Sequence, residues 1–488
     1  MKINLAPCFC LIVVFVVSSW FHSSSAEAAG KPNFVFIIAD DVSADDLAAY
    51  GNPSIKTPHL SRLAEEGLVF DRAYLTCSSC SPTRCSLITG RYPHNTGSPE
   101  LHLPLPAGQF MFPQALRENG YYTVLAGKNH MGPEVKPAFD KITDPAGPGG
   151  ERDWVERLAE RPDDKPFFMW FASNDAHRDW QKNDREPHYD PVQMRVPPFL
   201  FDGPITRQDL ADHAHEISRL DFFVGKVRAE LERQGVAENT YIIFTADNGR
   251  PFPRCKTRLY DSGTKTPFIV CRPGTIAPGR TASMISTIDL SATLLELAGV
   301  KIDERVQGVS FTPILSDPTA VTRDYAFAEH NWHVGQAHER SVRHGDWLYI
   351  RNNLPDVQNL CCEAGPVFPA GVELWEAHDA GKLNANQLDI FLVPRPRDEL
   401  YNVKDDPHQL RNLAADPARA ATLAELQQVL DRWTDETGDS VPENLTPTVA
   451  LAGARQHLQP SFKRGPMPGA DRGAATITRP GPIRKESL

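Results

Sequence analysis

Basic residues are in the minority in this chain of 488 residues. Lys and Arg total 51 against 62 Asp and Glu, so the formal net charge is −11. Because nucleic-acid binders usually carry a basic surplus, nucleic acid is not expected as a partner, and a polyanion would need a local basic pocket. Proline, in contrast, is abundant at 42 residues. Since proline interrupts helices, this number excludes a helical bundle or a coiled coil.

Cysteine is scarce, with 9 residues in the whole chain, which is too few for a disulfide scaffold. Cys8 and Cys10 lie in a segment typical of an export signal, in which Lys2 precedes the apolar residues 6–17 and small residues follow up to Ala28. We expect cleavage after Ala28. The protein would then be exported to the bacterial periplasm or the extracellular space, or to the lysosome if its source is eukaryotic.

Long apolar runs are also missing. No segment reaches the ~20 apolar residues that a membrane-spanning helix needs, so we expect no membrane span, with a retained N-terminal anchor as the alternative. The length fits one large domain with an appendage, or two domains. The expected division is a signal peptide at 1–28, a catalytic domain at 29–335, a C-terminal subdomain at 336–440 and a Pro/Gly-rich tail at 441–488.

Four short apolar runs stand out in the first half of the chain, at residues 33–39, 121–126, 166–172 and 241–246. Continuous apolar runs are typical of strands buried on both faces. Helical patterns accompany them, for example 206–234 with Thr206 as N-cap, and 287–298. This alternation predicts an α/β fold with a large, mostly parallel sheet between helices, followed by a smaller α+β subdomain with an antiparallel sheet.

Each of the four runs ends in polar residues, which are in order Asp40 and Asp41, then Lys128, Asn129 and His130, then His177, and finally Asp247 and Asn248. Ligands of open α/β sheets bind outside the carboxyl ends of the strands, so these side chains could meet at one site. The aspartates and Asn248 make a hard oxygen set, which suits Ca²⁺ and tolerates Mg²⁺. No Cys/His spacing indicates zinc.

The most informative motif is Cys80-Ser81-Pro82-Thr83-Arg84, continued to Gly90 and Arg91. Pro82 suits the first turn of a helix and Gly90 its end. Cys80 should therefore lie at a helix N-terminus, where N–H groups and the dipole favour an anion. An anion site needs positive charge around the anion's oxygens, and the chain offers five candidates for it: Arg84, Lys128, His130, His177 and Lys256.

This motif resembles the one whose cysteine is oxidised to formylglycine in the type I sulfatases of the alkaline phosphatase superfamily. The similarity runs from about residue 33 to 415, and the stretches 127–134, 177–178 and 247–253 are most similar to the sulfamidase (N-sulfoglucosamine sulfohydrolase) branch. The resemblance implies an alkaline-phosphatase-like fold, one bound Ca²⁺ with Mg²⁺ less favoured, and a formylglycine-generating enzyme as maturation partner. It implies a sulfated carbohydrate as substrate, with N-sulfoglucosamine of heparin-like glycans favoured.

The resemblance also implies roles for individual residues. Formylglycine (3-oxoalanine) made from Cys80 would complete a metal shell that contains Asp40, Asp41, Asp247 and Asn248. Arg84 and Lys128 would position its hydrate. His130 would act as the base that releases the covalent sulfate, and His177 and Lys256 would bind sulfate and assist the leaving group.

Several alternatives stay open. Asn129 and Lys256 stand where the sulfamidase branch tends to have lysine and arginine, and lysine at the latter position is commoner among O-sulfatases. An O-sulfatase acting on another sugar or on aryl sulfates is therefore an alternative. A phosphodiesterase or phosphonate monoester hydrolase of the same superfamily, and a non-catalytic protein that binds sulfated glycans, are two others. A homodimer is left open, as is the pairing of the remaining cysteines.

Overall fold

The computed structural model describes residues 1, 30–145, 147–358, 360–449 and 463–485. The expected export signal lies outside these residues, as does part of the expected tail. Among the residues described, no helix is both long and apolar enough to cross a membrane.

The centre of the molecule is an eight-stranded sheet with the order β4-β3-β5-β1-β6-β7-β2-β8. Its strands are β1 (Asn33–Ala39), β2 (Leu68–Tyr74), β3 (Tyr122–Gly127), β4 (Lys141–Thr143), β5 (Phe167–Ala172), β6 (Thr240–Ala246), β7 (Phe268–Cys271) and β8 (Gly279–Ser286). The four apolar runs form β1, β3, β5 and β6, which are adjacent and parallel. Only β7 is antiparallel to its neighbours. The mostly parallel sheet predicted from the sequence is confirmed.

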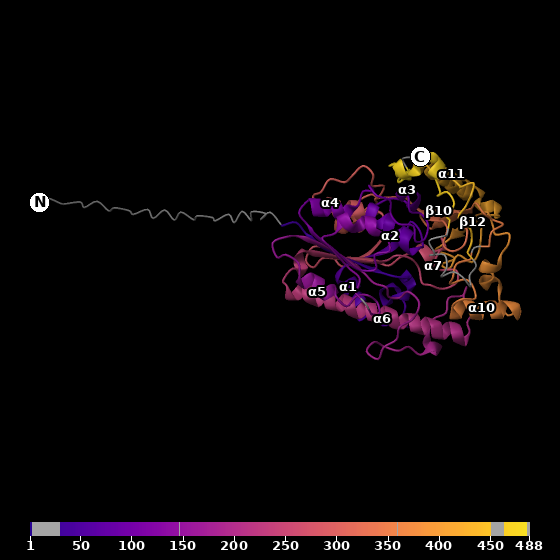
Figure 1. Cartoon of the computed structure of the whole chain (residues 1–488), viewed down its shortest axis with the longest axis horizontal. Helices are drawn as coiled ribbons and strands as arrows, with labels where there is room; N and C mark the ends of the chain where they lie inside the picture. The colour runs from indigo at the N-terminus through magenta and orange to yellow at the C-terminus, as the bar shows by residue number, and fades with distance from the viewer. Residues whose placement is uncertain (2–29, 146, 359, 450–462, 486–488) are drawn as a thin grey trace.

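Helices cover both faces of this sheet, as Figure 1 shows, with α2 and α4 on one side and α1, α5 and α6 on the other. Alternate residues of β1 explain the two layers. Phe34 and Phe36 belong to the core under α2 and α4, whereas Val35 and Ile37 belong to the core under α6. The helices of the chain are α1 (Pro58–Glu66), α2 (Cys80–Thr89), α3 (Pro93–Thr96), α4 (Phe112–Glu118), α5 (Trp154–Ala159), α6 (Pro204–Arg233), α7 (Asp261–Thr264), α8 (Asp289–Leu297), α9 (Thr312–Ser316), α10 (Pro369–Asp379) and α11 (Ala420–Thr437).

A second, antiparallel sheet lies towards the C-terminal end, at the right in Figure 1. It consists of β12 (Asp398–Asn402), β11 (Trp347–Asn352), β10 (Glu339–His344) and β9 (Tyr325–His330), in that order. α11 packs Leu430 and Trp433 into the same core as Tyr325 and Phe327 of β9. The smaller α+β part expected from the sequence is therefore present. Its first strand begins at Tyr325, ahead of the division expected near residue 335.

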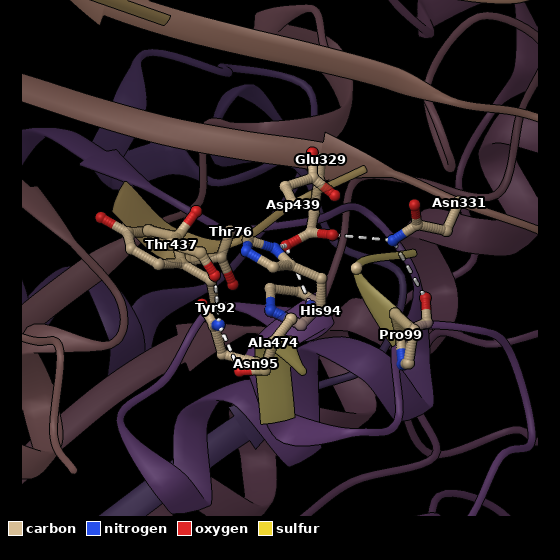
Figure 2. A network of polar contacts seen from close by, with 12 residues as sticks. Thr76, Tyr92, His94, Asn95, Pro99, Glu329, Asn331, Thr437, Asp439 and Ala474 are labelled. Atoms are coloured by element: carbon tan, nitrogen blue, oxygen red, sulfur yellow. Dashed lines mark hydrogen bonds and ion pairs between the residues drawn. The ribbon is translucent and has the colours of Figure 1, made fainter. Parts of the chain in front are cut away.

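A buried polar network joins this second sheet to α3 (Figure 2). We call it the junction network and define it by six residues: His94, Glu329, Asn331, His338, Arg340 and Asp439. Glu329 Oε1 lies 2.8 Å from His94 Nδ1, and its Oε2 accepts from Asn331 Nδ2 at 2.8 Å. Arg340 donates twice to Asp439, at 2.6 and 2.9 Å. Charged groups from sequence positions far apart thus pair inside the protein.

The described part of the expected tail also contacts this region. Arg91 Nη2 donates to the Ile477 carbonyl at 2.7 Å, and Asn95 Nδ2 donates to the carbonyls of Thr437 and Ala474 at 2.8 Å each. Figure 2 shows Asn95, Thr437 and Ala474 beside the junction network. Residues 463–485 therefore contact Arg91 and α3 on the side where α3 meets the end of α11.

Candidate active site

The carboxyl ends of the four parallel strands converge on one site, as expected. Asp40 and Asp41 follow β1, and Asp247 follows β6 directly. Backbone hydrogen bonds fix these ends, because the Asp40 N–H donates to the Asp175 carbonyl at 2.9 Å and the Asp247 N–H donates to the Ala39 carbonyl at 3.1 Å. Asp41 adopts a left-handed conformation with φ of 59°. This turn brings its carboxylate into the same cluster as the other two.

Four potential metal ligands meet in this cluster. Asp40, Asp41, Asp247 and Cys80 offer ligand atoms that all lie within 4.8 Å of one another. Asn248 is fully buried beside them, and its Oδ1 has no hydrogen-bond partner among the described residues. Burial raises the pKa of Asp41 to about 7 and of Asp247 to about 6, and in each case the Asp40 charge adds to the effect. Buried, mutually repelling oxygens with a free amide oxygen fit a hard divalent cation.

Three cationic side chains surround the carboxylates. Lys128 Nζ contacts Asp40 Oδ2, Arg84 Nη2 lies 2.8 Å from Asp247 Oδ2, and Lys256 Nζ lies 2.8 Å from Asp41 Oδ1. Although burial alone would raise the pKa of Asp40, the charges of Lys128, His177 and Arg84 lower it well below its usual value. Asp40 therefore stays ionised, and the cluster keeps three cationic groups directly beside its carboxylates.

Cys80 occupies the first position of α2, as the motif predicts. Gly90 ends the helix in a left-handed conformation, with φ of 68°. The thiol lies 3.7 Å from Asp40 Oδ1 and 4.0 Å from Asp41 Oδ1. Burial raises the pKa of the Cys80 thiol far above its usual value. A neutral, soft thiol is poorly suited to an oxygen-rich cation site, whereas an oxygen at this position would match the other ligands.

The loop after β3 supplies Lys128 and His130, and Gly127 makes its geometry feasible. Gly127 has φ of 99°, and a Cβ there would approach the Ala172 carbonyl oxygen to 1.8 Å. Only glycine allows this close contact between β3 and β5. Burial, followed by the charge of Lys128, lowers the pKa of His130 well below its usual value. His130 is thus a neutral imidazole able to accept a proton.

His177 follows β5 and reaches the same site. Its Nδ1 lies 2.5 Å from the Arg178 carbonyl, which can only accept, so Nδ1 carries the proton and Nε2 is left to exchange one. Burial and then the charge of Lys256 lower the pKa of His177 to about 4. In contrast, although burial would lower it, the charges of Asp41, Glu363 and Asp40 together raise the pKa of Lys256 well above its usual value. Lys256 is therefore the charged partner of this pair.

Two further residues reach the site that sequence reasoning missed. His102 Nδ1 lies 2.7 Å from His130 Nε2, and the His102 N–H donates to Ser81 Oγ at 2.7 Å. Glu363 Oε1 lies 3.6 Å from Lys256 Nζ. Both residues belong to loops that carry no periodic pattern and follow no predicted strand of the large sheet. The sequence therefore holds no local signal for either.

The residues predicted from the sequence are brought together with one exception. Asn129 lies in the same loop but serves its own turn, since its Nδ2 donates to the Gly132 carbonyl at 3.1 Å and its Oδ1 accepts from the Met131 N–H at 3.2 Å. Cys77, Cys80, Cys85, Cys255, Cys271 and Cys361 are free thiols.

Comparison with known proteins agrees with this geometry. The Sulfatase family model matches residues 32–147 and 152–300, and the model of the N-sulphoglucosamine sulphohydrolase C-terminal region matches 255–353. Human N-sulphoglucosamine sulphohydrolase is 30% identical over 83% of this chain and 90% of its own length. An ulvan-active sulfatase of Formosa agariphila is 29% identical over 85% of this chain and 77% of its own length.

Solved structures agree in fold. The structure of BT4656 in complex with its substrate, D-glucosamine-2-N,6-O-disulfate, superposes with a TM-score of 0.64 at 19% identity, covering 83% of this chain and 98% of that one. Ps i-CgsB in complex with a neocarrahexaose gives a TM-score of 0.64 at 20% identity, over 83% of this chain and 93% of that chain. With more than half of its residues matched by the family model, the chain belongs to the sulfatase family.

Proposed function

We propose that this protein is a formylglycine-dependent sulfatase that removes sulfate from N-sulfoglucosamine at the non-reducing ends of heparin-like glycans. The observation that carries the mechanism is the position of Cys80, at a helix N-terminus and within 4.0 Å of two carboxylates. A cysteine thiol suits this oxygen-rich environment poorly. A hydrated aldehyde made from the same residue would give it an oxygen nucleophile.

A divalent cation, with Ca²⁺ favoured, would be held by Asp40, Asp41, Asp247, Asn248 and an oxygen of the modified residue 80. The fit rests on the carboxylates that burial leaves with raised pKa values and on the partnerless Oδ1 of Asn248. When bound, the ion would supply positive charge to the oxygens of the sulfate group and of the nucleophile. Arg84, in contact with Asp247, would hold this cluster in place.

The chain's own residues account for the remaining chemistry. A hydroxyl of the residue 80 hydrate, oriented by Lys128, attacks the sulfur, and the bond from sulfur to nitrogen breaks. The proton that this hydroxyl loses passes through the Nε2 of His177, or through Lys256, to the nitrogen, so that the nitrogen leaves as an amine. His130 then takes the proton of the second hydroxyl, the aldehyde forms again and sulfate is released. Water restores the hydrate.

The preference for N-sulfate is supported by the similarity to human N-sulphoglucosamine sulphohydrolase and by the match to the C-terminal model of that enzyme. Of the two departures from the sulfamidase pattern, Asn129 is engaged in its own turn and bears little on substrate choice. Lys256 bears on it directly, because an ammonium also suits a departing alkoxide. We include in the proposal an exported protein that is matured by a formylglycine-generating enzyme.

Two measurements test this function. Mass spectrometry of the peptide that contains residue 80 should find formylglycine in active protein, and unmodified cysteine in fully active protein would rule the mechanism out. Initial rates on glucosamine N-sulfate and glucosamine 6-O-sulfate, compared at equal concentration, decide the substrate. A clear preference for the 6-O-sulfate would remove the N-sulfate assignment and leave a sulfatase for O-sulfated sugars.

A further inference from the structure

A buried carboxylate from the C-terminal part of the chain faces the candidate active site without a full set of partners. The Glu363 side chain is 7% exposed, and its Oε1 lies 3.6 Å from Lys256 Nζ. Its other oxygen, Oε2, has no hydrogen-bond partner among the described residues. Because a buried carboxylate oxygen without a hydrogen-bond donor is costly, Oε2 in this state points to a donor that arrives with a ligand.

The loop that carries Glu363 is held firmly against Lys256. Cys361 Sγ lies 4.0 Å from the Lys256 carbonyl oxygen, and the N–H groups of Ala364 and Gly365 donate to the Cys361 carbonyl at 3.2 and 3.1 Å. Gly371 at the start of α10 allows a close approach, since a Cβ there would lie 2.2 Å from the Gly365 carbonyl oxygen. The position of the carboxylate is thus set before a ligand binds.

The arrangement also indicates which part of a substrate Glu363 faces. Lys256 Nζ contacts both Asp41, at 2.8 Å, and Glu363, at 3.6 Å. Asp41 belongs to the candidate metal cluster, whereas Glu363 comes from a loop of the C-terminal part of the chain and also lies near His177. A carboxylate would repel the sulfate oxygens and cannot serve to bind them. The groups that remain for it are the hydrogen-bond donors of the leaving sugar.

We propose that Glu363 is a specificity-determining residue whose Oε2 accepts a hydrogen bond from the amino nitrogen of the leaving glucosamine. This proposal rests on the function proposed above, in which that nitrogen carries the sulfate. Before cleavage the donor is the N–H of the N-sulfo group. After cleavage the amine takes up a proton, and the contact becomes a charge-assisted one between ammonium and carboxylate. Glu363 would thus favour an amine over an alcohol as leaving group.

The test compares Glu363→Gln with wild type through inhibition by the two products. In Glu363→Gln, inhibition by glucosamine should weaken at least about tenfold, as expected for the loss of a hydrogen bond to a charged group. Inhibition by inorganic sulfate should change less than about threefold, because His177 and Lys256, the residues proposed to bind sulfate, remain. Glu376→Gln, which makes the same change of charge at an exposed position of α10, should leave both inhibition constants unchanged.

Other outcomes would overturn the proposal. If inhibition by sulfate weakened as much as inhibition by glucosamine, Glu363 would act only by holding Lys256. If neither weakened, Oε2 would not contact the sugar. Thermal unfolding of each variant shows whether the fold is intact. Should Glu363→Gln unfold early, Glu363→Asp, which keeps the charge but shortens the side chain, should show the same selective loss for glucosamine, and equal losses for both products would again overturn the proposal.

Failure of the proposed function gives a different result. A wild-type protein that hydrolyses glucosamine 6-O-sulfate but not glucosamine N-sulfate would refute the N-sulfate assignment. Calorimetric titration of glucosamine and of sulfate into wild type and Glu363→Gln would then test Glu363 without relying on turnover. Selective loss of glucosamine binding supports the contact with the amine, and unchanged glucosamine binding refutes it.

Discussion

The active site and the junction network both bury carboxylates, but they compensate them differently. Asp41 and Asp247 in the site are fully buried, and burial together with the Asp40 charge raises their pKa values to about 7 and about 6. Glu329 and Asp439 in the junction network are equally buried, yet their pKa values are lowered. Burial would raise them, but His94 and Arg340 together outweigh it at Glu329, and Arg340, His94 and His338 together outweigh it at Asp439.

The difference lies in how the partners are arranged. Arg340 holds Asp439 with two hydrogen bonds, so the negative charge is matched where it lies. In the site three carboxylates crowd together, and an amide oxygen beside them has no partner. Burial alone therefore does not identify a functional site. A functional site is indicated by buried charges that lack a full set of partners, because an ion or a substrate can complete that set.

Replacing Cys80 by alanine should give the largest effect in the site and none in the junction. If Cys80 supplies the nucleophile, Cys80→Ala removes the group that attacks sulfur, and turnover should fall by at least about 1,000-fold. The midpoint of thermal unfolding should stay within about 2 °C of wild type, because only a small buried thiol is lost. Residual turnover above a few per cent of wild type would contradict the role of Cys80.

Removal of divalent cations should give the second-largest effect on turnover. Chelation leaves Asp40, Asp41 and Asp247 facing one another in a desolvated cluster, so both turnover and the unfolding midpoint should decrease, and added Ca²⁺ should restore both. Asp247→Asn is the control, since it lacks one ligand and should respond much less to chelation. If exhaustive chelation changes neither quantity in the wild type, these residues do not hold a metal.

Breaking the junction network should lower the stability of the protein and leave its activity nearly unchanged. Asp439→Asn leaves Arg340 buried without its main partner, so the free energy of unfolding should fall by about 3–5 kcal/mol. The kcat of the protein that remains folded should change less than about twofold, because the site does not contact Asp439. Asp435→Asn removes an exposed carboxylate of α11 and should cost less than about 0.5 kcal/mol. Urea denaturation of both variants decides the point, and a large loss of kcat with unchanged stability would contradict the distinction.

Much of the fold follows from local sequence. The four apolar runs correspond to β1, β3, β5 and β6, because a strand buried on both faces needs apolar residues throughout. The ends of helices and strands are predicted less well from the sequence. Thr206 is not the N-cap of α6, which begins at Pro204 after Gly203. Glu373 of α10 accepts hydrogen bonds from the backbone N–H groups near this start, so a contact from far along the chain replaces the local cap.

The site follows the same rule. Side chains at strand ends and in the Cys80 motif could be predicted, because the topology of a parallel sheet brings its carboxyl ends together. Glu363 and His102 could not, since each approaches through a loop whose path depends on tertiary packing. The junction network could not be predicted from the sequence either. His94, Glu329 and Asp439 have no pattern in common, and only the docking of the second sheet makes them neighbours.

The smallest expected effect is a change in how the stability of the junction network depends on pH. His338 lies in the junction network, with Arg340 Nη2 at 2.9 Å and Asp439 at 3.9 Å from its Nε2, and burial, followed by the Arg340 charge, lowers its pKa from 6.5 to about 4. As pH falls below 6.5 the unfolded chain binds a proton that the folded protein refuses, so stability should decrease by about 1.4 kcal/mol per pH unit until pH 4.

His338→Gln lacks this titration. Its free energy of unfolding, measured by urea denaturation at pH 7, 6 and 5, should therefore fall less steeply than that of wild type. His378→Gln, at an exposed position of α10, should keep the wild-type slope. The other charged neighbour, Glu329, is present in all three proteins and cancels in the comparison. Equal slopes for His338→Gln and wild type would mean that His338 takes up a proton in the folded protein at the same pH as in the unfolded chain. The junction would then tolerate an extra charge, as the active site must when it binds an ion.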